Sequence, residues 1–447
     1  MFVDQRHDLH AGQARDYDLW RQMGNVGWGW DDVLPYFKRS EGHHGGGDAA
    51  HGVTGELRVE KQRLSWPVLD AVIDAAQELG IPRTDDFNRG DNEGAGYFEV
   101  NQRRGWRWNA RKAFLDPARH RDNLRIVTGA EVDSLTLASG RVTGVAFRQE
   151  GQVFHARARG EVVLSAGAIG TPKILELSGI GRGDLLQSLG IDVALDAPGV
   201  GENLADHLQI RTIYRIEGAQ TLNDHYATVM GKLKIGLDYA LRRRGPLAMA
   251  PSQFGIFTRS SPEHDTPNIE YHVQPLSLEA FGQPLHSFPA LTVSVCNLRP
   301  DSRGSVHVTG PDPAKAPAIR PNYLSAATDQ RVAVDSIRHA RRLMATAAMA
   351  RFHPVEIKPG PEIDGEEMLL TAAGDISTTI FHPVSTARMG VDDAAVVGPD
   401  LRLKGMDGLS IADASVMPTI TSGNTHAPVT MIAEKASDMI LDRLRER

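Results

Sequence analysis

The chain has 447 residues, of which 41% are hydrophobic and 23% charged, so its composition is that of a globular protein and excludes disorder and collagen-like structure. Its 49 Lys and Arg residues are outnumbered by 56 Asp and Glu residues, and the resulting net charge of −7 argues against nucleic-acid binding. The single cysteine excludes an internal disulfide, and the lack of a long apolar run or a signal-peptide core predicts a cytoplasmic protein with no transmembrane segment.

The first part of the chain predicts helices before strands. Segment 16–41 is rich in tryptophan and charge and predicts short helices packed by aromatic side chains, and residues 42–52 predict a flexible loop. Apolar residues recur at helical spacing from Pro67 to Leu79, and Gly80 predicts the end of that helix. Strands are expected at Leu124–Thr128, Val132–Leu137 and Val142–Arg148, with a hairpin turn at 138–140.

Residues 161–181 predict a strand, a glycine turn and a helix. Val162–Leu164 is a short apolar run, Gly167 and Gly170 mark the turn, and Pro172 is typical of a first helical turn. Open α/β sheets bind cofactors at the carboxyl ends of their strands, so this turn could receive a ligand. A tight turn without a ligand explains the spacing equally well.

The second part predicts a mixture of both element types. Helices are expected at Val229–Arg242, at Val332–Ala348 and from Pro428 onward. Alternating segments with one polar face predict an antiparallel sheet. These segments are Ile269–Val273, Leu291–Val295 and Ser305–Val308, and a further strand is expected at Leu409–Ala412.

Three residues in the last part are candidates for chemistry. His382 precedes a proline, Asp413 ends a strand, and His426 lies directly before a predicted helix. A helix N-terminus offers unpaired N–H groups and a positive partial charge, which suits a base or an anion site. Each residue taken alone also has a structural explanation: a buried hydrogen-bonded histidine for His382, and a cap for Asp413 and for His426.

Other chemistries do not fit the sequence. The run His44–Gly47 imitates a lipase oxyanion loop, but a G-x-S-x-G nucleophile motif is absent. His43, His44 and His51 could bind a metal, but a solvated loop explains them better. We therefore predict no metal site.

Five segments in a fixed order carry a family resemblance: GNVGWGWDDVLPYFKRSE (24–41), GAIGTPKILELSGIG (167–181), GVGENLADHL (199–208), HPVSTARMG (382–390) and DASVMPTITSGNTHAPVTMIAEKA (413–436). Together they resemble the glucose–methanol–choline (GMC) family of FAD-dependent oxidoreductases, and within it the alcohol dehydrogenases that are similar to choline dehydrogenase.

The resemblance implies an α/β (α+β) chain with an FAD-binding Rossmann-like domain and a substrate domain of antiparallel sheet and helices. The expected FAD-binding domain comprises residues 1–50, 100–205 and 376–447, and the substrate domain comprises 51–99 and 206–375. The N-terminal β-α-β unit of the family, which contains G-x-G-x-x-G, is missing from this sequence. The FAD-binding domain is therefore expected to be truncated at its N-terminus.

The resemblance further implies FAD-dependent oxidation of a primary alcohol, choline-like or aliphatic, to the aldehyde by hydride transfer to flavin N5. His382 matches the base of the family, and His426 matches the second site residue, which orients the alkoxide. The residues expected at the cofactor are Val132 against adenine, Asp413 and Ala414 near the pyrophosphate and flavin, and Asn424, Thr425 and Val429 at the flavin pyrimidine edge.

Two alternatives stay open at this stage. Besides alcohol oxidation, the sequence is compatible with a truncated, cofactor-free remnant without catalysis and with a flavin-containing lyase of the hydroxynitrile type. The electron acceptor and the particular alcohol cannot be read from the sequence.

Overall fold

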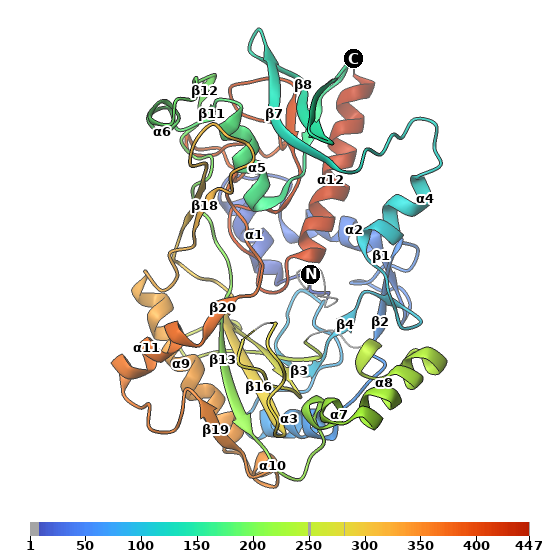
Figure 1. The fold of residues 1–447 in the computed structure, drawn as a ribbon, viewed down its shortest axis with the longest axis vertical. Coiled ribbons are helices and arrows are strands. Elements are labelled where there is room, and N and C mark those ends of the chain that lie inside the picture. The colour runs from blue at the N-terminus through green and yellow to red at the C-terminus, as the bar shows by residue number, and fades with distance from the viewer. Residues whose placement is uncertain (1–8, 249–251, 281, 447) are drawn as a thin grey trace.

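The computed structural model describes residues 9–248, 252–280 and 282–446, which form an elongated molecule with two parts (Figure 1). The lower part in this view is built on a large β-sheet flanked by helices. The upper part combines segments from the beginning, middle and end of the chain, so its core depends on contacts that are distant in sequence.

A seven-stranded antiparallel sheet forms the lower part. Its strand order is β19-β13-β16-β15-β14-β3, and β20 also pairs with β13. The strands are β3 (Gly94–Tyr97), β13 (Leu208–Arg215), β14 (Phe254–Thr258), β15 (Ile269–Gln274), β16 (Ala290–Asn297), β19 (Val355–Lys358) and β20 (Ser377–Thr379). The polar residues that the alternating pattern predicted on one face of β15 are buried: Glu270 and His272 pair with each other at 2.8 Å.

Helices cover this sheet and share its hydrophobic core. Helix α3 (Pro67–Glu78) begins and ends as predicted, with Gly80 at a φ of +80° after it. Helix α3 and α9 (Ala327–Met344) pack with β14, β15 and β16 in one core cluster, and α10 (Ala347–Ala350) and α11 (Glu366–Asp375) follow along the chain. This part of the fold is the rigid base on which β13 and β20 are positioned.

The upper part contains the strand–turn–helix unit. Strand β10 (Val162–Leu164) pairs in parallel with β21 (Leu409–Ile411), and helix α5 (Gly167–Leu177) follows β10. The long helix α12 (His426–Arg445) reaches this unit near its C-terminal end, where the Arg443 side chain donates to the Ser410 hydroxyl of β21 (2.9 Å). The predicted hairpin is present as β7 (Ala130–Ala138) and β8 (Arg141–Gln149), to which β9 (Gln152–Arg157) adds a third strand.

Aromatic side chains hold the N-terminal helices in this upper part. Helices α1 (Ala14–Gln22) and α2 (Trp30–Ser40) confirm the short helices predicted there. Tyr17, Trp20 and Trp28 are fully buried and belong to the same core cluster as the C-terminal segments. Fully burying three rings of this size contributes several kcal/mol in total, at about 25 cal/mol per Å² of apolar surface.

The remaining elements are short or peripheral, apart from α8. They are β1 (Glu41–His43), β2 (Leu57–Lys61), β4 (Glu99–Val100), β5 (Gln102–Arg103), β6 (Trp106–Arg107), a π-helical turn (Arg111–Leu115), α4 (Asp116–Ala118), β11 (Ile180–Gly181), α6 (Gly183–Ser188), β12 (Leu195–Asp196), α7 (Leu222–Ala227), α8 (Val229–Arg242), β17 (Ser305–His307), β18 (Ala318–Arg320) and 3-10 turns at Pro246–Ala248 and Ala414–Val416.

Two predictions about local structure were wrong. Residues 124–128 form no strand; Leu124, Ile126 and Val127 are between 37% and 44% exposed, because no neighbouring strand pairs with this segment. In the segment 42–52, predicted to be a solvated loop, the side chain of His51 is only 2% exposed and that of His43 10%. The exposed glycines between them conceal this burial in the sequence.

Helix boundaries differ from the predictions where proline was used to locate them. Pro172 lies inside α5, and the hydroxyl of Thr386 donates to the Ala168 carbonyl (2.7 Å), the group that a residue with an N–H at position 172 would have bonded. Helix α12 begins at His426, so Pro428 is its third residue. Proline fits anywhere in a first turn, because those N–H groups have no partner within the helix.

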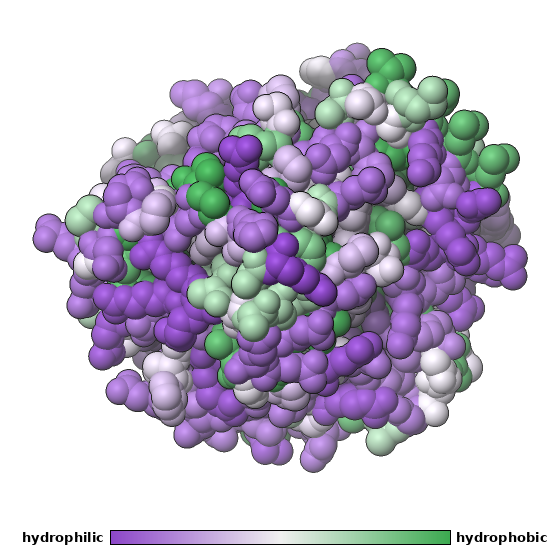
Figure 2. All heavy atoms as spheres, turned by 90° about the horizontal axis from the view of Figure 1, so that it is seen from below, coloured by the Kyte–Doolittle hydropathy of each residue, from purple (hydrophilic) through white to green (hydrophobic). Residues whose placement is uncertain are grey.

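The face of the molecule seen from below is predominantly hydrophilic (Figure 2). In the face seen from below, hydrophobic residues are scattered among hydrophilic ones and are denser at the upper right (Figure 2). Helix α8 exposes several large apolar side chains, among them Val229 at 86% and Leu241 at 80%. Among the described helices, none combines the length and the hydropathy that crossing a bilayer requires.

Candidate active site

His382 lies against His207 because two strands pair. Strand β20 runs antiparallel to β13, and His207 directly precedes β13 while His382 follows β20. Backbone hydrogen bonds between Ala205 and Val384 (2.9 and 3.2 Å) continue the pairing past both histidines. Both rings are buried, with His207 0% and His382 4% exposed. The result is a buried histidine pair beside the ends of β13 and β20.

The backbone on both sides of His382 is conformationally strained. Phe381 and Ser385 have φ values of +65° and +75°, a left-handed region that costs non-glycine residues free energy. The carboxylate of Asp206 fixes the segment, since it accepts hydrogen bonds from the His382 backbone N–H (2.8 Å) and from the hydroxyls of Thr379 and Tyr323. Strain maintained in this way at a histidine is typical of functional sites.

The contacts of His207 determine where the protons of the pair reside. Nε2 of His207 lies 3.0 Å from the Leu298 carbonyl, which can only accept, so Nε2 donates. Burial lowers the pKa of His207, so its ring is neutral and its Nδ1 is an acceptor. The His382 Nδ1, at 3.1 Å, must therefore donate to it. A neutral His382 then carries no proton on Nε2, the nitrogen that a base needs.

Asp413 has a structural role in this chain. One of its oxygens accepts from the Gly167 N–H (2.9 Å) and the Thr171 hydroxyl (2.6 Å), and the other accepts from the backbone and the hydroxyl of Ser415. Its carboxylate thus joins α5 to the turn after β21. The structural explanation given above, a capping carboxylate, describes what its side chain does here.

The Asp413–Ala414 segment lies beside the His382 segment. The Ser385 N–H donates to the Ala414 carbonyl (3.2 Å), and two further backbone hydrogen bonds continue this ladder at Ala387 and Met389. The structure therefore brings these two sequence-predicted blocks together. Val132 lies elsewhere, on β7, where it is partly buried and pairs with Phe147.

The loop that contains Asn424 and Thr425 is anchored to the N-terminal helix. Asp16 accepts hydrogen bonds from the backbone and the hydroxyl of Ser422, both at 2.8 Å, and the amide of Asn92 donates to the Ser422 carbonyl. The loop leads into α12, whose first residue is His426 and whose N-cap Thr425 makes no side-chain capping bond. The Val429 N–H bonds to the Thr425 carbonyl inside the helix, so this amide is not directed outward.

Features of these segments fit a bound cofactor. Ser385 Oγ and Thr421 Oγ1 are buried and have no hydrogen-bond partner in the described part of the chain, although buried hydroxyls normally have one. The N-terminus of α12 carries a positive partial charge, which suits the electron-rich edge of a reduced flavin. Buried hydroxyl groups that can bind a polar ligand are thus present in the segments that the family resemblance assigns to the flavin.

Sequence reasoning missed His207, Asp206 and Asp16. The first two were quoted only as part of the segment 199–208, and their signal is an acid–histidine pair directly before a buried strand. Asp16 carries no signal in the sequence, because its role depends on a loop 406 residues away.

A large groove lies outside this site. It has a volume of about 980 Å³ and lies between α8 and α3, with Trp66, Leu233 and Leu237 among its lining residues. None of the sequence-predicted site residues belongs to its described lining. The groove therefore contributes nothing to the assignment of the site.

Comparisons with known proteins identify the family of the chain. The N-terminal and C-terminal family models of GMC oxidoreductases match residues 10–209 and 300–433. An alcohol dehydrogenase (acceptor) from Pseudomonas putida is 34% identical over 437 residues, which cover 97% of this chain and 79% of the relative. An oxygen-dependent choline dehydrogenase from Burkholderia pseudomallei is 37% identical over 434 residues, or 96% of this chain and 76% of the relative.

Solved structures show the same fold. Pyridoxine 4-oxidase from Mesorbium loti superposes with a TM-score of 0.85 at 30% identity and covers 97% of this chain and 81% of that one. A formate oxidase from Aspergillus oryzae superposes with a TM-score of 0.91 at 24% identity, covering 98% and 83%, and supports the fold alone. The chain has the mixed α/β fold of these enzymes and belongs to the GMC oxidoreductase family, whose members resemble it over nearly its whole length.

Proposed function

We propose that this chain binds FAD and oxidises a primary alcohol, choline-like or aliphatic, to the aldehyde. The observation that carries the proposal is the buried His207–His382 pair, which leaves the proton off Nε2 of His382. The choline and alcohol dehydrogenases among the relatives support this class of substrate. The electron acceptor stays open.

His382 acts as the base in this proposal. Its Nε2 accepts the hydroxyl proton of the alcohol, while its Nδ1–H continues to donate to His207. The Asp206 carboxylate, bonded to the His382 backbone, favours the positive charge that then develops on the ring. Bound FAD supplies the chemistry that the side chains lack, because its flavin accepts the hydride from the alcohol carbon.

His426 orients the substrate oxygen. As the first residue of α12, it is held at the helix N-terminus, and a hydrogen bond from its ring to the alkoxide stabilises the charge that forms there. The dipole of α12 acts in the same direction. In this proposal His382 removes the proton from the substrate oxygen and His426 stabilises the resulting alkoxide.

The hydrogen bonds of Asp413 determine how this residue enters the proposal. Because its carboxylate is fully used, Asp413 acts through the backbone that it shares with Ala414, near the pyrophosphate and the flavin. Asn424, Thr425 and the helix end at Val429 face the pyrimidine edge, and the Val132 main chain meets adenine. We assign the FAD-binding region to 1–50, 100–205 and 376–447, and the substrate region to 51–99 and 206–375.

Anaerobic spectroscopy tests the proposal. The full chain is incubated with FAD, freed of excess cofactor, and mixed with choline or with a medium-chain primary alcohol. We expect bound flavin absorbance that one of the alcohols bleaches. Bound flavin that no alcohol bleaches, together with cleavage of a hydroxynitrile, would establish the lyase alternative, and a chain that retains no flavin would establish the cofactor-free remnant.

A further inference from the structure

A second cluster of histidines and acids lies on the three-stranded sheet formed by β1, β2 and β4. Strand β1 pairs in parallel with β2, and β2 pairs with β4 so that Lys61 stands opposite Glu99. This pairing, together with the turn after β1, brings His43 and His44 to the Glu99 side chain. The proposed alcohol oxidation uses none of these residues.

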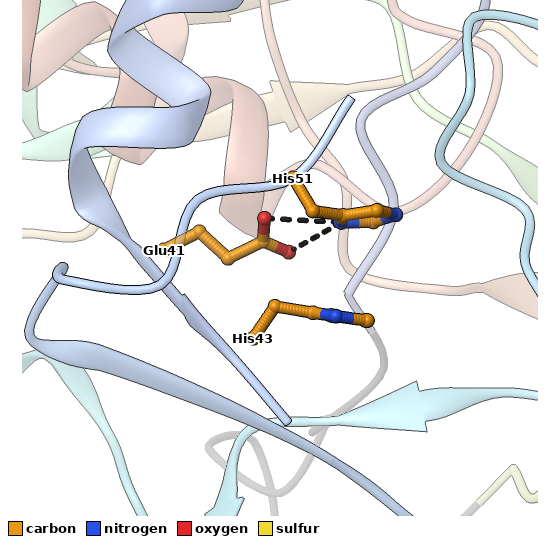
Figure 3. Close-up of side chains that lie close together, drawn as sticks. All are labelled: Glu41, His43 and His51. Carbon is orange, nitrogen blue, oxygen red and sulfur yellow. Dashed lines mark hydrogen bonds and ion pairs between the residues drawn. The ribbon is translucent and has the colours of Figure 1, made fainter. Parts of the chain in front are cut away.

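One side of the cluster is a closed hydrogen-bonded set. The two ring nitrogens of His51 bond to Glu41 and to Asp86, each at 3.0 Å, and the Glu41 carboxylate also accepts the Gly52 N–H at 2.9 Å. Figure 3 shows the Glu41 carboxylate directed at His51 while the His43 ring lies face to face with the His51 ring. The ring centroids are 4.0 Å apart. His51 and Glu41 thus form the wall of the cluster.

The other side converges on one carboxylate. Nε2 of His43 lies 3.0 and 3.1 Å from the two oxygens of Glu99, and Nε2 of His44 lies 2.8 Å from the first oxygen. One donor atom from each of these three residues falls within 4.8 Å of the others. The side chains of Glu99 and His43 are 5% and 10% exposed, whereas His44 is 29% exposed and opens the group to solvent.

The charge of Glu99 is not balanced by a fixed cation. In the described structure its carboxylate pairs only with the two imidazoles, and no Lys or Arg reaches it. A buried charge needs either a charged partner or a metal ion. Two imidazole nitrogens and a carboxylate are the donor set of many zinc sites, with water completing the coordination.

We propose that His43, His44 and Glu99 bind one Zn²⁺ ion. Ligand bonds of about 2.0–2.2 Å in a tetrahedral site place the donor atoms roughly 3.3–3.5 Å apart. The observed nitrogen–oxygen separations of 2.8–3.1 Å open to this spacing through small side-chain rotations. The ion fastens the turn after β1 to β4 and occupies a site separate from the His207–His382 pair.

Binding requires a tautomer change at His43 and at His44, since Nε2 of each ring donates to the Glu99 carboxylate when no metal is bound. The Gly45 N–H donates to Nδ1 of His43 at 3.1 Å, so without metal the ring proton resides on Nε2, facing Glu99. Metal at Nε2 moves that proton to Nδ1, and the Gly45 amide must turn away. Gly45, Gly46 and Gly47 are exposed, and glycine permits this rotation at low conformational cost. Metal coordination thus replaces the hydrogen bonds from His43 and His44 to Glu99, and the further loss is one solvent-accessible hydrogen bond from Gly45.

Metal titration tests this site independently of the oxidation. The full chain is stripped with a chelator, dialysed and titrated with ZnCl₂ by calorimetry, and Co²⁺ replaces Zn²⁺ for visible spectroscopy. We expect one ion per chain with micromolar or tighter affinity, and Co²⁺ bands typical of a tetrahedral nitrogen–oxygen site. Glu99→Gln and His44→Ala should each weaken the affinity by at least about 10²-fold, since each removes a ligand.

A matched control separates this site from adventitious binding. His155 is exposed on β9, so His155→Ala removes one imidazole and should leave the zinc affinity unchanged. His44 is partly exposed, so His44→Ala should keep the far-ultraviolet circular dichroism of the folded chain even if Glu99→Gln does not. Absence of micromolar binding, or an affinity that His44→Ala leaves intact, would overturn the proposal.

Discussion

Nδ1 of His207 and Nδ1 of His382 lie 3.1 Å apart, and the Leu298 carbonyl determines which of them donates. Because this carbonyl can only accept, the order of donors runs from His382 through His207 to the backbone. The proton arrangement that a base requires is thus set by a backbone group after β16, in the rigid sheet. His207 is therefore a positioning residue for His382.

Replacing His207 should slow the reaction without removing the cofactor. In His207→Phe the His382 Nδ1–H loses its acceptor, so the tautomer with the proton on Nε2 becomes accessible. We expect flavin reduction by the alcohol to slow by about 10–10²-fold. Anaerobic stopped-flow across pH 6–9 measures this rate, and bound flavin absorbance serves as the control.

His207→Gln provides the rescue. A glutamine amide can donate to the Leu298 carbonyl and accept from His382 at once, so most of the rate should return. Equal rates for wild type and His207→Phe would show that the pair does not position the base.

Thr386→Val should destabilise the fold. The Thr386 hydroxyl satisfies the Ala168 carbonyl, which Pro172 leaves without its helical partner. Losing this buried hydrogen bond should lower the free energy of unfolding by about 1–2 kcal/mol, as measured by urea denaturation. Thr371→Val on the exposed helix α11 is the matched control and should change it by less than about 0.5 kcal/mol. Equal losses of unfolding free energy in the two variants would show that the Thr386 hydroxyl does not compensate for the hydrogen bond that Pro172 lacks.

Asp413→Asn distinguishes a structural role from direct cofactor binding. The carboxylate receives four hydrogen bonds from Gly167, Thr171 and Ser415, and an amide nitrogen cannot accept. We expect a loss of about 2–3 kcal/mol in the unfolding free energy of the chain measured without FAD. Unchanged stability of that chain, with only FAD affinity reduced, would show that the carboxylate serves the cofactor directly.

Acid should destabilise the protein through buried histidines. Burial lowers the pKa of His339 to about 4, and its Nδ1 lies 2.5 Å from the Tyr271 hydroxyl. In the unfolded chain the His339 imidazole takes up a proton near pH 6.5, whereas in the folded chain it does so only near pH 4. The stability that depends on a neutral His339 is therefore fully present above pH 6.5 and is lost between pH 6.5 and 4. Within this window each pH unit lowers the free energy of unfolding by about 1.4 kcal/mol.

His339→Gln should make the pH dependence shallower, since it still accepts from Tyr271 but takes up no proton. Urea denaturation at pH 7.5 and pH 5 compares the two chains. His155→Gln, at an exposed position, should behave like wild type. A His339→Gln chain with the wild-type slope would assign the acid sensitivity to other groups, such as His10, whose pKa burial also lowers to about 4.

Elements with strong local patterns could be predicted from the sequence. Helix α8 has the predicted bounds, and β7 and β8 were found with their turn, because period and turn chemistry are local signals. The strand predicted at 124–128 was wrong because a strand also needs a neighbouring strand to pair with, and the local sequence does not show one. The helix start predicted from Pro172 was wrong because Thr386, 214 residues later in the sequence, supplies the hydrogen bond to the Ala168 carbonyl that the proline cannot make.

The candidate site was predictable only in part, because some of its contacts join segments that are distant in the sequence. His382 and His426 stood out through their unusual neighbours and the family resemblance, and their roles stay predictions. His207 became visible only when β13 and β20 paired. His43 and His51 appeared solvated because glycines lie between them, whereas their side chains are 10% and 2% exposed. His44 is the partly exposed member of the group.

The most direct test of the account is the anaerobic rate of flavin reduction in His382→Ala. The variant should retain bound FAD, because His382 contacts His207 and is not among the proposed cofactor contacts. Reduction by the alcohol should slow by about 10²–10⁴-fold, the usual contribution of a general base. A His382→Ala chain that binds FAD and is reduced at the wild-type rate would contradict the assignment of the base and, with it, the proposed mechanism.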